Sequence, residues 1–167
     1  YMMPFRPVTF AVRAMHIGRY GQGGEDTRLL PLFLGYSTFV RGYDPGSFTV
    51  AECTFTATGS CEEFDRLSGS RLLVINTEAR IPAFGIVNRR MDYGPIPLEI
   101  FGFFDAGVAW NRGEKPSFAG GTRDWVTSAG IGARVNALGF AIVELNLARP
   151  LQRQGAGWQF VFNLRPG

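Results

Sequence analysis

Apolar and polar residues alternate with a period of two along several stretches of the chain, which is the pattern of β-strands. In residues 96–110 the even-numbered positions are apolar or glycine, while the odd-numbered positions carry both Glu99 and Asp105. The same split into an apolar and a polar face recurs in five other stretches: residues 8–14, 71–81, 127–138, 140–151 and 157–165. The pattern predicts six strands, comparable in length with the roughly nine to eleven residues that cross a bilayer.

Two all-β folds would use such strands differently. A soluble sandwich or small barrel buries the apolar face and wets the polar face, whereas a membrane barrel turns the apolar face to lipid and the polar face to its lumen. The polar face of a soluble sheet normally carries abundant Lys, Glu and Thr. Here it carries single Arg, Glu, Asp and Asn residues between glycines and alanines, which favours the membrane barrel. Several aromatic residues near strand ends suit interfacial girdles: Tyr20, Trp110, Phe140 and Trp158.

Composition narrows the class of protein further. A chain of 167 residues is one domain by length, and no window approaches eighteen consecutive apolar residues, so no transmembrane helix is expected. Sixteen of the seventeen basic residues are arginine, Lys115 being the exception, and guanidinium groups suit fixed, partly buried ion pairs. The net charge of +3 is spread along the chain without a basic run, so nucleic acid is not an expected partner.

The longest connection runs over residues 20–69, and a connection of that length is usually functional. It holds the sequence Val40-Arg41-Gly42-Tyr43. Asp105 lies inside an apolar strand, and a carboxylate is almost never buried without a partner. Arg41 is the natural candidate for that partner, and the alternation places Glu78 on the same polar face as Asp105.

The sequence contains no set of residues that indicates catalysis, and we expect no cofactor. Glu99, Arg134 and Glu144 lack a nucleophile with a base and an orienting group, so a hydrated polar network is the better interpretation. Cys53 and Cys61 lie close together in a polar region, which favours a local disulfide over two free thiols. No histidine is near them, so no metal site is expected.

Five motifs follow one another in a characteristic order. Val-Arg-Gly-Tyr stands at residues 40–43, a glutamate-containing strand ending in proline at 76–82, and Phe-x-Asp-x-Gly at 103–107. A Ser-x-Gly-x-Gly-x-Arg strand at 128–134 and an Ala-Arg-Pro ending at 148–150 complete the series. Together they resemble the C-terminal barrel region of the Omp85 superfamily, the BamA/TamA-type outer-membrane proteins that carry bacterial surface antigen domains.

The resemblance implies an antiparallel transmembrane β-barrel, of which residues 1–167 would be the C-terminal portion. The family's barrel has sixteen strands, so the six strands here would be strands eleven to sixteen, and the first residues would be the tail of a preceding strand or turn. It implies a bacterial outer-membrane protein without enzymatic activity that inserts barrel proteins or moves polypeptides across the membrane. The implied partners are outer-membrane lipid or lipopolysaccharide, client polypeptides, and accessory outer-membrane or periplasmic subunits.

The resemblance also assigns roles to particular residues. Residues 20–69 would be an extracellular loop that folds into the lumen, where Arg41 would meet Asp105 and Glu78. The loop lock would comprise both motifs, with these residues: Val40, Arg41, Gly42, Tyr43, Glu78, Asp105 and Gly107. The last strand would close the barrel seam and carry the insertion signal through Trp158, Phe160, Phe162 and Leu164, although the chain lacks the family's terminal aromatic residue. Two alternatives remain open: an orphan anchoring barrel subunit of a larger assembly, and a soluble β-sandwich binding module.

Overall fold

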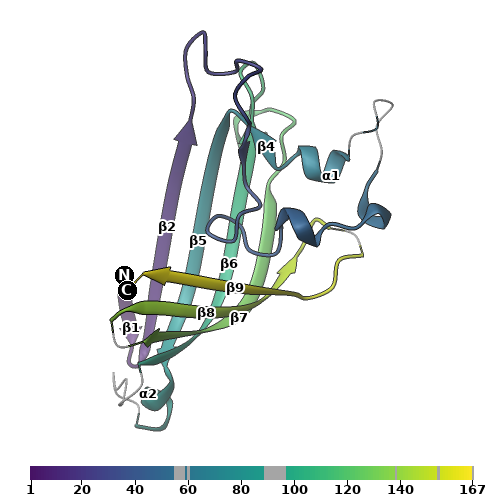
Figure 1. Cartoon of the computed structure of the whole chain (residues 1–167). Helices are drawn as coiled ribbons and strands as arrows, with labels where there is room; N and C mark the ends of the chain where they lie inside the picture. The colour runs from purple at the N-terminus through teal and green to yellow at the C-terminus, as the bar shows by residue number, and fades with distance from the viewer. Residues whose placement is uncertain (55–58, 60, 89–96, 138, 154, 167) are drawn as a thin grey trace.

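The structure is a computed structural model that describes residues 1–54, 59, 61–88, 97–137, 139–153 and 155–166. Seven strands form one antiparallel sheet in the order β1-β2-β5-β6-β7-β8-β9, so each strand pairs with its neighbour in the order (Figure 1). The strands are β1 Met2–Phe5, β2 Val8–Gly18, β5 Arg71–Pro82, β6 Leu98–Trp110, β7 Val126–Ala137, β8 Ala141–Pro150 and β9 Gln159–Pro166.

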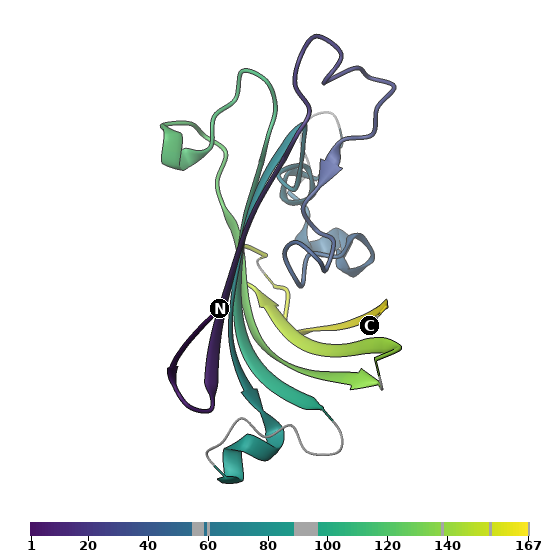
Figure 2. The ribbon, with the colours of Figure 1, turned by 90° about the vertical axis from the view of Figure 1, so that its left-hand side faces the viewer.

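The connection between β2 and β5 lies on the concave side of this sheet, toward which β8 and β9 curl (Figure 2). It contains a small second sheet and three short helical segments, at β3 Leu32–Phe33, η1 Pro45–Ser47, η2 Val50–Glu52, α1 Glu62–Asp65 and β4 Ser68–Gly69. Helix α2 Ala83–Asn88 follows β5 at the opposite end of the sheet, and η3 Ser117–Ala119 follows β6 at the end that carries the long connection.

The two faces of the main sheet differ sharply in polarity. We call the concave face, which the long connection covers, the inner face. The outer face consists of the even-numbered positions of β2, β6 and β9 and the odd-numbered positions of β5, β7 and β8. On the inner face Asp105 is 0% exposed and Glu144 is 1% exposed, whereas Ile131 and Phe160 on the outer face are 59% and 66% exposed. Charged side chains are therefore buried on the inner face, and large apolar side chains are exposed on the outer face.

The main hydrophobic cluster lies between the long connection and the inner face near the loop end of the sheet. The connection contributes four of its buried members, and β5, β6 and β7 contribute the others: Leu34, Val40, Tyr43, Leu67, Leu72, Val74, Ala109 and Val126. Burying such side chains stabilises the packed loop by roughly 1.5–3 kcal/mol for each fully buried large residue. This cluster fixes the height at which residues 40–43 meet the sheet.

All six predicted strands are present, and the opening residues form the short β1 strand. The strand predicted from residue 96 begins at Leu98, and Ile96 lies outside the described residues. The prediction that Trp158 belongs to the last strand is wrong, because the pairing of β8 with β9 begins at Ala148 and Gln159. Continuing this register would set Trp158 opposite Arg149 and Gly157 opposite Pro150, which has no amide N–H to donate, so the ladder ends near this point. The short helices were not anticipated, because each is too brief to produce a periodic apolar stripe.

Candidate functional site at the tip of the long connection

The tip of the long connection places Arg41 directly against Asp105 on β6. The Arg41 Nε atom donates to Asp105 Oδ2 at 2.7 Å, and Nη2 donates to Asp105 Oδ1 at 2.9 Å. The backbone N–H of Arg41 also donates to Asp105 Oδ2, at 3.2 Å. Paired hydrogen bonds between a guanidinium and a carboxylate are strong and directional, so they fix both the distance and the orientation of the loop tip.

Two further carboxylates and an aromatic ring complete the surroundings of Arg41. The Arg41 Nη1 atom lies 3.1 Å from Glu78 Oε1 on β5 and 3.7 Å from Glu144 Oε1 on β8. The Arg41 guanidinium carbon lies 3.6 Å from the centre of the Phe103 ring, a cation–π distance. With 5% of its side chain exposed, Arg41 joins three strands of the inner face to the loop.

Asp105 has a further donor that links it to the loop backbone. The Asn76 Nδ2 atom donates to Asp105 Oδ1 at 2.8 Å and to the Phe39 carbonyl oxygen at 2.7 Å. Arg13 on β2 donates through Nε to Asn76 Oδ1 at 3.0 Å and also reaches the Thr38 carbonyl oxygen. The fully buried carboxylate of Asp105 is thus held by donors from the loop and from β5, which offsets its desolvation.

A second arginine cluster continues the network away from the loop tip. The Arg134 Nη2 atom lies 2.7 Å from Glu144 Oε2 and 3.4 Å from Glu78 Oε2, and Nη1 lies 3.6 Å from Glu99 Oε2. Arg80 pairs with Glu78 Oε2 at 2.8 Å. Charges of opposite sign alternate along the inner face, so Glu78 and Glu144 are each shared between Arg41 and at least one other arginine, whereas the partners of Asp105 are Arg41 and Asn76.

Glycine allows the loop to approach the sheet at two points. A Cβ atom on Gly107 would lie 2.8 Å from Val40 Cγ2 and 2.9 Å from Leu34 Cδ2, closer than real Cβ atoms come. Gly42 has φ +87°, a left-handed conformation that side chains rarely adopt, and its Cα faces Ala148 and Pro150 of β8. The glycines of both motifs therefore set the contact distance between loop and sheet.

Tyr43 connects the loop tip to β7 and to the turn that follows β8. Its hydroxyl donates to the Thr127 carbonyl oxygen at 2.9 Å and lies 2.9 Å from Gln152 Oε1. The ring is 1% exposed and belongs to the main hydrophobic cluster. Burial raises the pKa of the Tyr43 hydroxyl, although hydrogen bonds around it partly oppose this.

A second buried arginine, Arg153, was not singled out by the sequence. It lies in the turn between β8 and β9, and its Nη1 atom donates to the Gly42 carbonyl oxygen at 2.7 Å and to Ser47 Oγ at 2.8 Å. Its Nε atom donates to Glu52 Oε2 at 2.9 Å, and the guanidinium carbon lies 3.9 Å from the centre of the Phe48 ring. We call the contacts of Arg153 with Gly42, Ser47 and Glu52 the Arg153 clamp. A lone arginine in a turn produces no periodic signal, so only the fold reveals these contacts.

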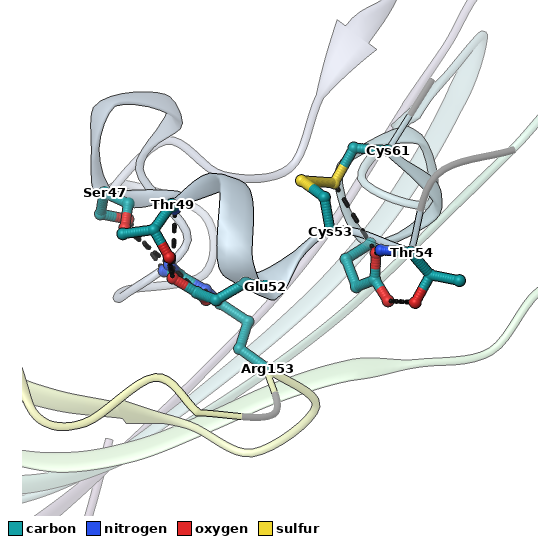
Figure 3. The surroundings of a disulfide bond; sticks show 8 residues. Ser47, Thr49, Glu52, Cys53, Thr54, Cys61 and Arg153 are labelled. Atoms are coloured by element: carbon teal, nitrogen blue, oxygen red, sulfur yellow. Dashed lines mark hydrogen bonds and ion pairs between the residues drawn. A yellow bond between two sulfur atoms is a disulfide. The ribbon is translucent and has the colours of Figure 1, made fainter. Parts of the chain in front are cut away.

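A disulfide joins Cys53, the residue after Glu52, to Cys61 (Figure 3). Cys53 directly follows η2, the helical turn that ends at Glu52, and the Thr49 hydroxyl donates to Glu52 Oε1 at 2.9 Å. Burial raises the pKa of Glu52, but hydrogen bonds from Thr49 and Arg153 outweigh it, so the pKa lies below its ordinary value. The Cys53–Cys61 link and the Thr49 bond together limit the movement of Glu52 relative to Arg153.

The residues predicted for a terminal-strand seam lie away from Arg41. Phe160, Phe162 and Leu164 are exposed on the outer face of β9, the last strand of the sheet. The inner face of the same strand does contact the loop, because the Ser37 hydroxyl donates to Asn163 Oδ1 at 2.5 Å. The structure thus gathers Val40, Arg41, Gly42, Tyr43, Glu78, Asp105 and Gly107 at one site, and it adds Glu144 and Arg153.

The site is a network of buried ion pairs and close-packed side chains. Within the described part of the chain, no group of three or more His, Cys, Asp or Glu residues is arranged to hold a metal ion. None of the described helices is long and apolar enough to span a membrane. Each carboxylate that meets Arg41 is neutralised by at least one arginine, so the arrangement is suited to holding a segment in place.

An antiparallel open sheet with an apolar outer face and a charged, loop-filled inner face is a section of a β-barrel wall. A scan against known protein families matches residues 5–166 to the Omp85 superfamily domain, so the chain belongs to the Omp85 superfamily. The predicted fold class is confirmed by this match. Proteins of the family reside in bacterial or organellar outer membranes, and its barrels are generally non-enzymatic transport or assembly proteins. The comparisons with curated proteins and with solved structures found no match.

Proposed function

We propose that this chain forms the C-terminal wall of a bacterial outer-membrane barrel that inserts barrel proteins into the membrane or moves polypeptides across it. The observation that carries the proposal is the reversed polarity of the sheet, in which Asp105 is fully buried on the inner face while Ile131 stands bare on the outer face. Lipid would cover the bare apolar surface, and the inner face would line the lumen. The partners would be membrane lipid, client polypeptides and accessory outer-membrane or periplasmic subunits.

We further propose that residues 20–69 are an extracellular loop folded into that lumen and that Arg41 is its lock. The loop tip contacts β5, β6 and β8 through a single guanidinium. Removing one partner of a buried ion pair typically costs about 3–5 kcal/mol, because the other charge stays buried and unpaired. The lock would stiffen the strands nearest the seam, and an unpaired strand edge at that seam is a template for an incoming client strand.

A charge exchange tests the lock. Arg41→Glu and Asp105→Arg should each make the loop sensitive to protease and lower the unfolding temperature in detergent. The double variant restores opposite charges and should recover part of the loss. Arg28→Glu is the matched control, since the Arg28 side chain is 87% exposed and pairs only with Asp26 among the described residues. Single variants that behave like the wild type would show that the cluster holds nothing in place.

An assembly assay separates insertion from the anchoring alternative. The whole protein is placed in phosphatidylcholine vesicles, and a urea-unfolded eight-stranded outer-membrane barrel is added as the probe. Folding of the probe is followed by its heat-modifiable gel migration. An inserting barrel should speed this folding relative to empty vesicles, and Arg41→Ala should reduce the gain. A protein that is itself folded in the vesicles but gives no gain would support the anchoring role instead.

A further inference from the structure

Charged side chains are almost absent from the outer face of the sheet. In the described residues of β2 and of β5 to β9, the outer face carries two of them, Arg71 and Arg149. Each lies at the loop-side end of its own strand, because Arg71 is the first residue of β5 and Arg149 is the second-last residue of β8. Across the sheet, Arg149 is opposite Ala129, which is opposite Phe104. The opposite end of the described outer face carries no charged side chain, so the charge of this surface is polarised.

Apolar residues adjoin each arginine on the outer face of its own strand. The residues that follow Arg71 on the outer face of β5 are Leu73 and Ile75, and Leu147 and Leu145 precede Arg149 on β8. An arginine on the lipid-facing side of a barrel destabilises it far more at the bilayer midplane than near the interface. Each arginine is the last outer-face residue of its own strand on the loop side, directly beyond apolar residues of that strand.

Aromatic side chains form a cradle around Arg71. A Cβ atom on Gly18, the strand partner of Arg71, would lie 2.7 Å from the Tyr20 ring, so that ring folds back over the outer face. The Arg71 guanidinium carbon lies 4.8 Å from the centre of the Tyr20 ring. His16 stacks on Trp110 at 5.6 Å between ring centres, and its Nε2 atom lies 2.5 Å from the Tyr20 hydroxyl oxygen. The cradle combines rigid rings with a fixed positive charge.

Arg71 retains unused hydrogen-bonding capacity in this cradle. Its Nε atom is buried and has no hydrogen-bond partner among the described residues, although buried donors are normally paired. The carboxylate of Glu25 interacts electrostatically with Arg71, but it already accepts hydrogen bonds from the Ser70 hydroxyl at 2.6 Å and from the Arg112 backbone N–H. No ion pair to Arg71 occurs within the described part of the chain, and Arg149 is exposed there without one.

We propose that Arg71 and Arg149 bind the phosphate groups of lipids in the leaflet on the loop side of the membrane. A phosphorylated lipid headgroup fits the site, because guanidinium binds phosphate in a bidentate manner and the apolar residues beside each arginine accept acyl chains. The Tyr20 and Trp110 rings suit the headgroup level, where one end of a side chain is apolar and the other is wet. This inference rests on the proposed membrane-spanning role and assigns that role a specific lipid contact.

Binding of bisphosphorylated lipid A to the detergent-purified whole protein tests the proposal, with retention of the lipid followed by native mass spectrometry. Arg71→Gln and Arg149→Gln should each weaken binding about fivefold, and the double variant should combine the losses, since an arginine near an anionic membrane surface contributes about that factor. Arg6→Gln is the matched control, because Arg6 is an exposed arginine in the β1–β2 turn at the opposite end of the sheet. The control should bind lipid A as the wild type does.

The probe itself provides the second comparison. Dephosphorylated lipid A should bind the wild type as weakly as the phosphorylated lipid binds the double variant, and millimolar inorganic phosphate should not displace the lipid. Equal binding by the wild type and the double variant overturns the proposal, as does full displacement by inorganic phosphate. Heat-modifiable migration is recorded for every variant. A folded barrel that binds phosphorylated and dephosphorylated lipid A equally well contradicts the lipid site alone. A chain that stays folded without detergent contradicts the membrane role itself.

Discussion

At the scale of single residues, the site depends on the shape of arginine as much as on its charge. Arg41 bridges Asp105 in a fork and stacks on Phe103, and a lysine ammonium can do neither in the same geometry. A buried ion pair is not by itself evidence of stability, because desolvation opposes its attraction. What the pair contributes here is a fixed geometry, because two hydrogen bonds and a ring contact define where the loop tip lies.

Arg41→Lys tests this use of shape. The charge is kept but the second hydrogen bond and the ring contact are lost, and a hydrogen bond to a charged group is worth about 1.5–3 kcal/mol. We expect the free energy of unfolding to fall by about that amount, as measured by denaturant titration in detergent. Arg28→Lys alters a comparable but exposed pair with Asp26, and we expect no measurable change there. Equal effects of the two substitutions would contradict the argument.

Gly107→Ala tests the close approach of loop and sheet. The added methyl group would meet Val40 and Leu34 at under 3.0 Å, so the loop tip must retreat and lengthen the Arg41–Asp105 contact. Overpacking of this kind typically costs about 1–3 kcal/mol. Gly102→Ala on the same strand is the control, because its Cβ would meet nothing nearer than the Gly130 carbonyl oxygen at 3.9 Å. Protease digestion of the loop should distinguish the two variants.

At the scale of elements, the sequence was informative where a physical rule acts over several residues. Period-two alternation located every long strand, and the cost of burying Asp105 without a partner pointed to Arg41. No comparable rule applies to Arg153, because one residue in a turn has no period and its partners in the long connection are over a hundred positions away. The contact of Glu144 with Arg41 depends on how β8 curls, which alternation does not specify.

The Arg153 clamp should weaken in acid. The pKa of Glu52 is lower in the folded protein than its ordinary value of 4.5, so the carboxylate stabilises the loop above pH 4.5 and that contribution is lost as the pH falls through the folded pKa. We expect hydrogen exchange in residues 44–53 to rise as the pH is lowered from 7 to about 3, after correction for the intrinsic pH dependence of exchange. In the Glu52→Gln variant, hydrogen exchange in residues 44–53 should already be raised at pH 7, and it should change less than in the wild type as the pH is lowered.

Other loop carboxylates provide the comparison for this experiment. Hydrogen bonds from Thr54 hold the pKa of Glu63 below its ordinary value, so it titrates in the same direction. Glu63 is not bonded to Arg153, and Glu63→Gln should therefore leave the acid response of residues 44–53 in place. If Glu52→Gln retained the full acid response, the clamp would not be its source.

At the scale of the whole molecule, the reversed polarity of the sheet raises the question of whether water or lipid surrounds its outer face. In a soluble protein, replacing an exposed apolar residue with arginine is nearly neutral or improves solubility. In a barrel wall the same replacement at the bilayer midplane costs about 2–4 kcal/mol, and the cost falls to about 0–1 kcal/mol near the interfaces. The depth dependence of the cost is therefore a direct measure of what surrounds the outer face.

Ile131→Arg and Ala137→Arg make that measurement on one strand. Ile131 is at the centre of β7 and pairs with Gly102 and Leu147, whereas Ala137 is its last residue; both lie on the outer face. In lipid vesicles we expect the free energy of unfolding to fall by about 2–4 kcal/mol for Ile131→Arg and by less than about 1 kcal/mol for Ala137→Arg. Both variants keep the inner-face lock intact, so a difference reports the surroundings of the strand. Two neutral variants would identify a water-facing sheet, because only a hydrocarbon environment makes the central position more costly than the end.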